Sequence, residues 1–200
     1  MVSGIVTDEK FDVMYPEEYY SERLCGHDEV RGAIVIANEI YKYFSPKSVV
    51  DIGCGVAMEL FNFKKLGVKV LGIDRSNFAK KHAFINEFEV WDLRNSYNFR
   101  EKFDVCISFD FIEHVEPEYE NIVLDNIVNS SDIAIISVPY PSGDPLHYNE
   151  QPREYWIEAF KRRDYYYDSM ATTVLKEKTL GSRYWAPQYM QVFRRIKNEN

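Results

Sequence analysis

The sequence predicts an α/β fold, in which a doubly wound, mostly parallel sheet of about seven strands lies between two layers of helices. The first observation is that short β-branched runs alternate along the chain with segments whose apolar residues recur at helical spacing. Such an alternation favours parallel strands that are covered on both faces. The second observation is that no clear helix separates the last two expected strands, which predicts an antiparallel pair at one edge of the sheet.

The expected elements follow one another at short intervals. The strands are apolar runs that are β-branched or alternate with polar residues, and they cover residues 48–52, 68–73, 87–91, 103–109, 133–138, 165–167 and 188–196. The helices are amphipathic, and they cover residues 32–44, the run from a glycine turn to 66, 76–82, 117–128 and 152–160. Residues that favour helix ends mark several boundaries, namely Gly67, Ser76, Pro117 and Pro152. Residues 1–30 lack clear periodicity and form either an arm or a short helix that opens at Pro16.

Composition limits the class of protein. The chain has 200 residues and a net charge of −8, so duplex nucleic acid, which requires a concentrated basic surface, is not expected as a partner. No apolar run approaches the ~20 residues of a membrane-spanning helix, and the N-terminal region is too polar for a signal peptide. Because Cys25, Cys54 and Cys106 are far apart in the sequence, we expect free thiols in a cytoplasmic protein and no zinc site.

The first expected strand leads into the motif Asp51-x-Gly53-x-Gly55, and a helix follows. Two glycines between a strand and a helix N-terminus allow a ligand to approach the main chain, as in nucleotide-binding turns. A phosphate-binding loop would also need a lysine, which is missing at the required offset. A dinucleotide-binding turn would need a third glycine where Met58 stands. The turn therefore predicts a nucleotide-like ligand of another kind.

Acidic residues stand at the ends of four successive expected strands. They are Asp51, Asp74, Asp92 and Asp110. In parallel sheets, ligands bind beyond the carboxyl ends of the strands, near the point where the strand order reverses. We therefore expect these four acids to lie around one site.

These motifs, in this order and spacing, resemble those of the class I S-adenosylmethionine-dependent methyltransferases. The resemblance covers roughly residues 33–140, and it is carried by Asp51-x-Gly53-x-Gly55 with Glu59-Leu60, by Asp74, by Asp92-Leu93, by Phe103-Asp104-Val105 and by Asp110-Phe111-Ile112-Glu113-His114-Val115. It implies S-adenosylmethionine as the cofactor and S-adenosylhomocysteine as its product. The length of the chain predicts one domain over residues 1–200. With the resemblance, we expect an arm or lid at 1–32, a cofactor-binding core at 33–140 and an acceptor side at 141–200.

The resemblance implies roles for individual residues. Asp74 would bind the ribose hydroxyls, and Asp92 would meet the adenine amine, with Leu93 packed on or beside the ring; the alternative for Asp92 is a turn cap. The full set of expected cofactor contacts is Asp51, Gly53, Cys54, Gly55, Asp74, Arg75, Asp92, Leu93, Asp110 and Phe111. Ala57 stands where many family members have glycine, and we expect tighter packing there with the site retained.

Methyl transfer from a sulfonium is a direct displacement, in which the enzyme mainly aligns the acceptor. An oxygen acceptor also calls for a general base, and histidine suits this role near neutral pH. His147 and His114 are the candidate catalytic residues, with a structural role as the alternative for each. The expected acceptor-side residues are Tyr15, Tyr19, Tyr20, Tyr140 and His147, of which the first three would belong to a lid.

Residues 138–160 resemble, more loosely, the tail of small methyltransferases that act on sugars and other metabolites. The tetrad Asp110-Phe111-Ile112-Glu113 does not match the motif of nucleic-acid amino-methyltransferases. We therefore expect O-methylation of a small-molecule hydroxyl, and no metal ion, since no acidic cluster beyond the cofactor set is evident. The alternatives are a non-catalytic binding protein with the same fold and an NAD(P)-dependent oxidoreductase. The sequence does not indicate an oligomeric state.

Overall fold

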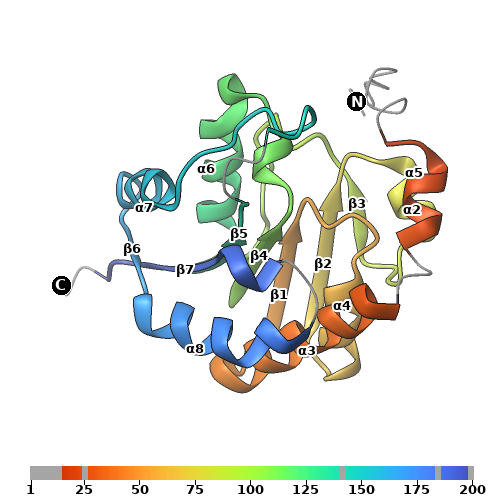
Figure 1. Ribbon diagram of the computed structural model, residues 1–200, viewed down its shortest axis with the longest axis horizontal. Coiled ribbons are helices and arrows are strands. Elements are labelled where there is room, and N and C mark those ends of the chain that lie inside the picture. Colours follow the sequence, from red (N-terminus) through yellow and green to blue (C-terminus); the bar gives the residue numbers. More distant parts are fainter. Residues whose placement is uncertain (1–14, 24–26, 140–142, 183–185, 198–200) are drawn as a thin grey trace.

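The computed structural model describes residues 15–23, 27–139, 143–182 and 186–197. Within these residues, seven strands form a single sheet in the order β3-β2-β1-β4-β5-β7-β6 (Figure 1). The strands are β1 (Ser48–Ile52), β2 (Lys69–Asp74), β3 (Phe88–Val90), β4 (Val105–Phe109), β5 (Ile133–Ser137), β6 (Tyr165–Tyr167) and β7 (Met190–Arg195). The first five pair in parallel, whereas β7 runs antiparallel to both β5 and β6. The predicted α/β sheet with an antiparallel edge pair is confirmed.

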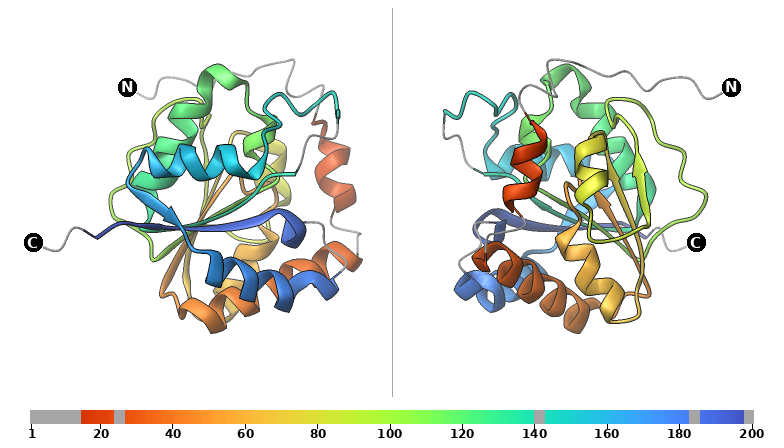
Figure 2. Two further views of the ribbon diagram at one scale, coloured as in Figure 1. Left: turned by 60° about the vertical axis from the view of Figure 1, so that its left-hand side comes forward. Right: turned by 90° about the vertical axis from the view of Figure 1, so that its right-hand side faces the viewer.

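Helices cover both faces of this sheet (Figure 2). The helices on one face are α3 (His27–Phe44), α4 (Met58–Lys65) and α8 (Ser169–Thr179), and those on the other are α6 (Glu120–Ser130) and α7 (Arg153–Lys161). Val49 and Val50 are adjacent in β1, and both are fully buried, one in each of the two apolar cores. Strands buried on both faces must be apolar at successive positions, which explains the continuous β-branched runs in the sequence.

Helix α8 is the main element that the sequence does not predict. It lies between the two closing strands, where no helix was expected, and Asp168 caps it by accepting a hydrogen bond from the backbone of Ala171 at 2.9 Å. Two of its buried residues are threonines, Thr172 and Thr179, whose hydroxyls donate to main-chain carbonyls within the helix. Polar residues on the buried face weaken the amphipathic pattern, so the helix is hard to recognise from the sequence.

Short elements complete the described part of the chain. They are α2 (Glu17–Arg23), α5 (Asn77–His82), α9 (Ala186–Tyr189) and three short 3₁₀ helices, η1 (Ile112–His114), η2 (Pro117–Tyr119) and η3 (Leu180–Ser182). Helix α2 agrees with one of the two expectations for the N-terminal region, a short helix that opens at Pro16. Among the described helices, none combines the length and apolar character needed to cross a membrane.

Candidate active site

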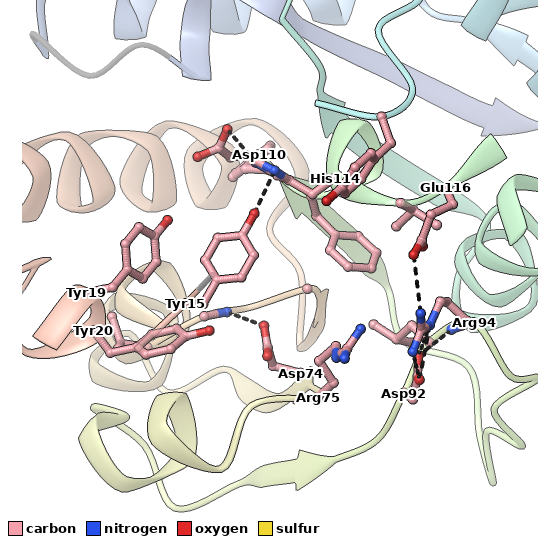
Figure 3. A pocket seen from close by; sticks show the side chains of 18 residues that line it. Tyr15, Tyr19, Tyr20, Asp74, Arg75, Asp92, Arg94, Asp110, His114 and Glu116 are labelled. Carbon is pink, nitrogen blue, oxygen red and sulfur yellow. Dashed lines mark hydrogen bonds and ion pairs between the residues drawn. The ribbon is translucent and has the colours of Figure 1, made fainter. Parts of the chain in front are cut away.

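A pocket opens at the carboxyl ends of β1 to β4 (Figure 3). The chain runs outward from β1 to β3 and then returns to place β4 on the other side of β1, so the strand order reverses between β1 and β4. The residues that line the pocket come from the loops after these strands and from the N-terminal segment; they are Tyr15, Tyr19, Tyr20, Gly53, Gly55, Val56, Asp74, Arg75, Asp92, Leu93, Arg94, Phe109, Asp110, Phe111, His114, Val115, Glu116 and Tyr148. The pocket therefore lies at the position where doubly wound sheets bind ligands.

The glycine turn after β1 depends on the absence of a side chain at its first glycine. Gly53 has φ +78°, and a Cβ atom there would lie only 2.1 Å from Cγ of Phe111. Gly55 also has a positive φ, +49°, but a Cβ atom there would contact nothing within 4 Å. Ala57 begins α4 with φ 60° and ψ 42°, a left-handed conformation that glycine adopts more easily. Its backbone geometry, and not only its packing, explains why glycine suits this position.

Asp51 and Cys54 are buried beside the turn but do not line the pocket. Burial raises the pKa of Asp51 well above its ordinary value, and the carboxylates of Glu59 and Asp74 raise it further. The Sγ atom of Cys54 lies against Gly72, where a Cβ atom would come within 2.8 Å of it. The structure thus places these two expected cofactor contacts behind the main chain of the turn.

Asp74 ends β2 and lies in the pocket with its carboxylate fixed by the main chain. One of its oxygens accepts a hydrogen bond from the backbone of Gly55 at 3.0 Å, and the other accepts one from Ser76 at 2.8 Å. Burial raises the pKa of Asp74, although these two hydrogen bonds oppose the shift. Burial also raises the pKa of Tyr20, and the nearby charge of Asp74 adds to that effect. Asp74 therefore binds the main chain of the glycine turn and also lies close enough to Tyr20 to affect its pKa.

Asp92 follows β3 and forms a close ion pair with Arg94. The Nε and Nη2 atoms of Arg94 lie 3.1 Å and 2.8 Å from the Asp92 carboxylate, which also accepts the backbone N–H of Arg94 at 3.0 Å. Burial alone would raise the pKa of Asp92, but the contacts with Arg94 outweigh it and lower the value. Arg94 also reaches Glu116 at 3.4 Å. Asp92 thus lines the pocket and caps a turn, and the sequence analysis missed Arg94 and Glu116.

Asp110, Glu113 and His114 follow β4 in one tight turn. Asp110 has φ 53°, and its Oδ1 atom lies 3.7 Å from Nε2 of His114. Glu113 is fully buried, and neither of its carboxyl oxygens has a hydrogen-bond partner within the described residues. Burial raises the pKa of Glu113 to about 9, with the charge of Asp110 as the second cause. Only Asp110 and His114 of these three line the pocket.

The two candidate bases lie side by side, because the loop after β5 folds back over η1. The ring centroids of His114 and His147 are 4.7 Å apart. Nδ1 of His114 lies 2.9 Å from the Tyr15 hydroxyl and 3.1 Å from the carbonyl oxygen of Leu146. Nδ1 of His147 lies 2.8 Å from Oε1 of Glu150. His147 does not line the pocket.

Tyrosines from the N-terminal segment form one wall of the pocket. Tyr19 makes edge-to-face contacts with both Tyr15 and Tyr20, at centroid distances of 5.2 Å. Helix α2 is attached to α5 through Glu17, whose Oε1 atom lies 2.6 Å from Nζ of Lys81 and 2.9 Å from Nε2 of His82. The expected contributions of Tyr15, Tyr19 and Tyr20 to the pocket agree with this placement, whereas Tyr140 lies outside the described residues. Tyr148 also lines the pocket and was not predicted.

The fold and the pocket together indicate a class of enzyme. Its members have a doubly wound sheet, a glycine turn after β1 that has no phosphate-binding lysine, and a carboxylate after β2. A family model described as a methyltransferase domain matches residues 34–168. The chain belongs to this family and is an S-adenosylmethionine-dependent methyltransferase of class I, with S-adenosylmethionine as its cofactor. The recognition made from the sequence motifs is confirmed.

Known proteins similar to this chain include ubiquinone biosynthesis O-methyltransferases from two strains of Rhodopseudomonas palustris, BisA53 and TIE-1. They are 37% identical over 75 residues, a match that spans 34% of this chain and 29% of theirs. Magnesium protoporphyrin IX methyltransferase from Synechocystis PCC 6803 with bound S-adenosylmethionine has a TM-score of 0.61 at 17% identity, covering 94% of this chain and 92% of that one. The plantazolicin methyltransferase BpumL also has a TM-score of 0.61 at 17% identity, covering 95% and 92%. At these identities the two structures show a common fold.

Proposed function

We propose that this enzyme transfers the methyl group of S-adenosylmethionine to a hydroxyl group of a small molecule. The observation that carries the proposal is the continuity of the pocket, whose lining extends from Gly53, Gly55 and Asp74 to Tyr15 and His114. A cofactor on the glycine turn and a small acceptor against the tyrosines would share one cavity. In-line displacement requires this arrangement, since the acceptor oxygen must approach the methyl carbon opposite the sulfur.

On the cofactor side, Asp74 would bind the ribose. Each carboxylate oxygen can accept more than one hydrogen bond, so the bonds from Gly55 and Ser76 leave acceptor capacity for two hydroxyls. Leu93 is buried in the pocket lining and would pack against the adenine, next to the Asp92–Arg94 pair. The methionine part would then lie along the main chain of the glycine turn. Asp51 and Cys54 would support this turn from behind.

On the acceptor side, the hydroxyl oxygen would supply the electron pair of the new O–CH₃ bond. The S–CH₃ bond breaks, its electron pair returns to sulfur, and the cofactor leaves as the neutral thioether S-adenosylhomocysteine. The hydroxyl proton must pass to a nearby base or to water. Of the two candidate histidines, His114 lines the pocket, and its Nε2 atom lies 3.7 Å from Asp110, which supports one of these two groups as the proposed base.

Several observations support a small-molecule acceptor. One wall of the pocket is built from Tyr15, Tyr19 and Tyr20, and tyrosines combine apolar contact area with a polar tip. The net charge of −8 is unfavourable for binding a nucleic acid. The similar proteins include enzymes named for O-methylation in ubiquinone biosynthesis and for methylation of plantazolicin. We further propose a cytoplasmic location, which agrees with the free thiols of Cys54 and Cys106.

Transfer of a labelled methyl group tests the acceptor class. The full chain would be incubated with methyl-labelled S-adenosylmethionine and with separate metabolite, protein and RNA fractions of a cell extract. We expect label in the metabolite fraction, on an oxygen that mass spectrometry can locate. Label confined to the protein or RNA fraction, or on nitrogen, would contradict the proposal.

Replacement of Asp74 tests the cofactor side separately. Asp74→Asn removes the negative charge but keeps an oxygen that can accept from Gly55 or Ser76, so the apoprotein should remain folded. We expect it to weaken S-adenosylhomocysteine binding by about 10- to 100-fold, the effect of about 1.4–2.7 kcal/mol of lost ribose contact. Calorimetry and the ligand-induced rise in melting temperature would measure this change. Equal affinity in the variant would remove Asp74 from the ribose site.

A further inference from the structure

Four side chains that can bind a metal ion meet beside the pocket. Asp110, Glu113, His114 and His147 each offer one ligand atom, and these four atoms all lie within 4.8 Å of one another. The first three are held in one turn after β4. The fourth comes from the loop after β5, so the cluster depends on how that loop is folded against η1.

Glu113 is the observation that distinguishes this cluster from an ordinary group of polar residues. Its side chain is fully buried, and neither carboxyl oxygen has a hydrogen-bond partner within the described part of the chain. A buried carboxyl group that lacks hydrogen-bond partners costs free energy, because it has lost its contacts with water. Asp110, in the same cluster, carries charge of the same sign. A cation between these groups would remove the cost.

The two histidines are oriented as metal ligands usually are. Nδ1 of His114 is 3.1 Å from the carbonyl oxygen of Leu146, and Nδ1 of His147 is 2.8 Å from the carboxylate of Glu150. A carbonyl or carboxylate oxygen accepts a hydrogen bond from an N–H group, so these contacts assign the proton to Nδ1 and the lone pair to Nε2 in each ring. With this assignment the Tyr15 hydroxyl, 2.9 Å from Nδ1 of His114, also accepts from that nitrogen. An imidazole whose other nitrogen donates to a carboxylate or carbonyl is the usual support of a metal-binding histidine.

Asp110 and His114 face each other across the cluster. Nε2 of His114 and Oδ1 of Asp110 are 3.7 Å apart, which is too far for a hydrogen bond (Figure 3). The two atoms are nevertheless close enough to bind one ion together.

The loop that carries His147 is held firmly in place. The backbone of Asn149 donates to the carbonyl oxygen of Glu113 at 3.0 Å, and its side chain donates to Glu120 at 2.8 Å. Asn149 is itself buried. His147 is therefore positioned before any ligand arrives, as a tight metal site requires.

We propose that Asp110, Glu113, His114 and His147 bind a divalent first-row transition metal ion such as Mn²⁺. Two imidazoles and two carboxylates are donors that suit Mn²⁺, Fe²⁺, Co²⁺ or Zn²⁺ better than Ca²⁺. The proposal differs from the expectation of no metal made from the sequence, where His147 is separated from the other three residues.

The position of the cluster gives the ion a role that rests on the proposed function. Asp110 and His114 line the pocket, whereas Glu113 and His147 lie behind them. An ion held by all four would face the acceptor position on its pocket side. There it would lower the pKa of a hydroxyl group that contacts it and fix the direction of the oxygen, so that the proton could leave to water.

Metal binding is measured without any methyl transfer. The full chain, treated with a chelator and then freed of it, would be titrated with Co²⁺, followed by visible absorption, and with Mn²⁺, followed by calorimetry. We expect a single ion per chain, with Glu113→Gln and His147→Asn each weakening the affinity at least about tenfold. Mn²⁺ should also raise the melting temperature of the wild-type chain, and should raise that of Glu113→Gln by less at the same concentration.

Matched substitutions outside the cluster control for non-specific binding. Glu101→Gln removes an exposed carboxylate that pairs with Lys69, and His82→Asn removes a histidine that pairs with Glu17. Both should bind the metal as the wild type does. Glu113→Gln should itself fold, because it replaces a buried carboxyl group with a neutral group of the same shape.

Two outcomes would overturn the metal site: no binding at millimolar Co²⁺ and Mn²⁺, or binding that Glu113→Gln and His147→Asn leave unchanged. Its failure is distinguishable from failure of the proposed function. Hydroxyl methylation at an unchanged rate in the presence of a chelator would reject the role given to the ion and leave the proposed function standing. Tight metal binding together with label on nitrogen would support the site and reject the acceptor class.

Discussion

The cofactor half and the acceptor half of the pocket are built in different ways. In the proposed cofactor half, main-chain groups fix the acid that ends β2: the carboxylate of Asp74 accepts hydrogen bonds from the N–H groups of Gly55 and Ser76. In the acceptor half, side chains fix one another: Tyr15 contacts His114, and Glu17 attaches α2 to α5. Main-chain contacts are set by local sequence, whereas side-chain contacts between distant segments can change independently. The first half therefore suits a constant ligand and the second a variable one.

The strongest test of this comparison is Gly53→Ala, which should damage the cofactor half through its main chain. The new methyl group would meet the ring of Phe111 at 2.1 Å, and φ +78° is strained for alanine. We expect a loss of about 3 kcal/mol or more in the free energy of unfolding, from overpacking and left-handed strain together. Denaturant unfolding of the apoprotein measures it.

Gly55→Ala is the matched control for this prediction. It has the same change of residue type and a positive φ, +49°, but no atom within 4 Å of the new Cβ. Only the backbone strain remains, so we expect a cost of about 1 kcal/mol. Similar losses in the two variants would show that contact with Phe111 does not determine the role of the first glycine.

Asp51→Asn should produce a smaller, pH-dependent effect on the same half. Asp51 is buried, and its pKa is raised by burial, by Glu59 and by Asp74. Between the ordinary pKa of aspartate and the raised one, the folded chain keeps a proton that the unfolded chain releases. The free energy of unfolding of the wild type therefore falls as the pH rises through that window.

Asparagine does not titrate, so the variant should escape this loss. We expect Asp51→Asn to melt at a higher temperature than the wild type near neutral pH, and the difference to shrink as the pH falls toward 4. Melting curves of the apoprotein from pH 4 to pH 8 would measure it. A difference that stays constant across this range, or one of opposite sign, would contradict a raised pKa for Asp51.

Tyr15→Phe should give the smallest effect on stability and should act on the acceptor half alone. It removes the hydroxyl that lies 2.9 Å from Nδ1 of His114 and leaves the ring in place. We expect a loss of about 1 kcal/mol in unfolding free energy and a fall of about tenfold in kcat/KM for the acceptor. The affinity for S-adenosylhomocysteine, measured by calorimetry, should stay within about twofold of the wild type. A large loss of cofactor affinity would show that the two halves are not independent.

Most of the fold could be predicted from the sequence, because strands buried on both faces leave an unmistakable apolar pattern. The element that was missed, α8, has Thr172 and Thr179 on its buried side, and their hydroxyls are satisfied within the helix. Such hydrogen bonds cannot be recognised in a hydrophobic pattern. Helix α3 also begins earlier than expected, at His27 instead of residue 32.

Much of the pocket lining was predicted, including the tyrosines of the N-terminal segment, and the motifs at the strand ends were its clearest signal. Gly53, Gly55, Asp74 and Asp92 all line the pocket, because each follows directly from the end of a parallel strand. The position of Asp51 and Cys54 behind the turn depends on side-chain direction, which the motif does not specify. Contacts such as Gly53 with Phe111, or His147 with the turn after β4, join segments far apart in the chain, and spacing alone does not reveal them.

The attachment of α2 has a consequence for how the enzyme responds to its solvent. Glu17 is partly exposed, and its contact with Lys81 is an ion pair at the surface, so dissolved salt screens it. The hydrogen bonds that fix Asp74 are made to the main chain in the interior and are hardly affected by salt. Ionic strength therefore acts on the attachment of α2, which carries Tyr19 and Tyr20, and leaves the hydrogen bonds of Asp74 unchanged. Under the proposed assignment of the pocket, the electrolyte around the protein would then change acceptor binding and not cofactor binding.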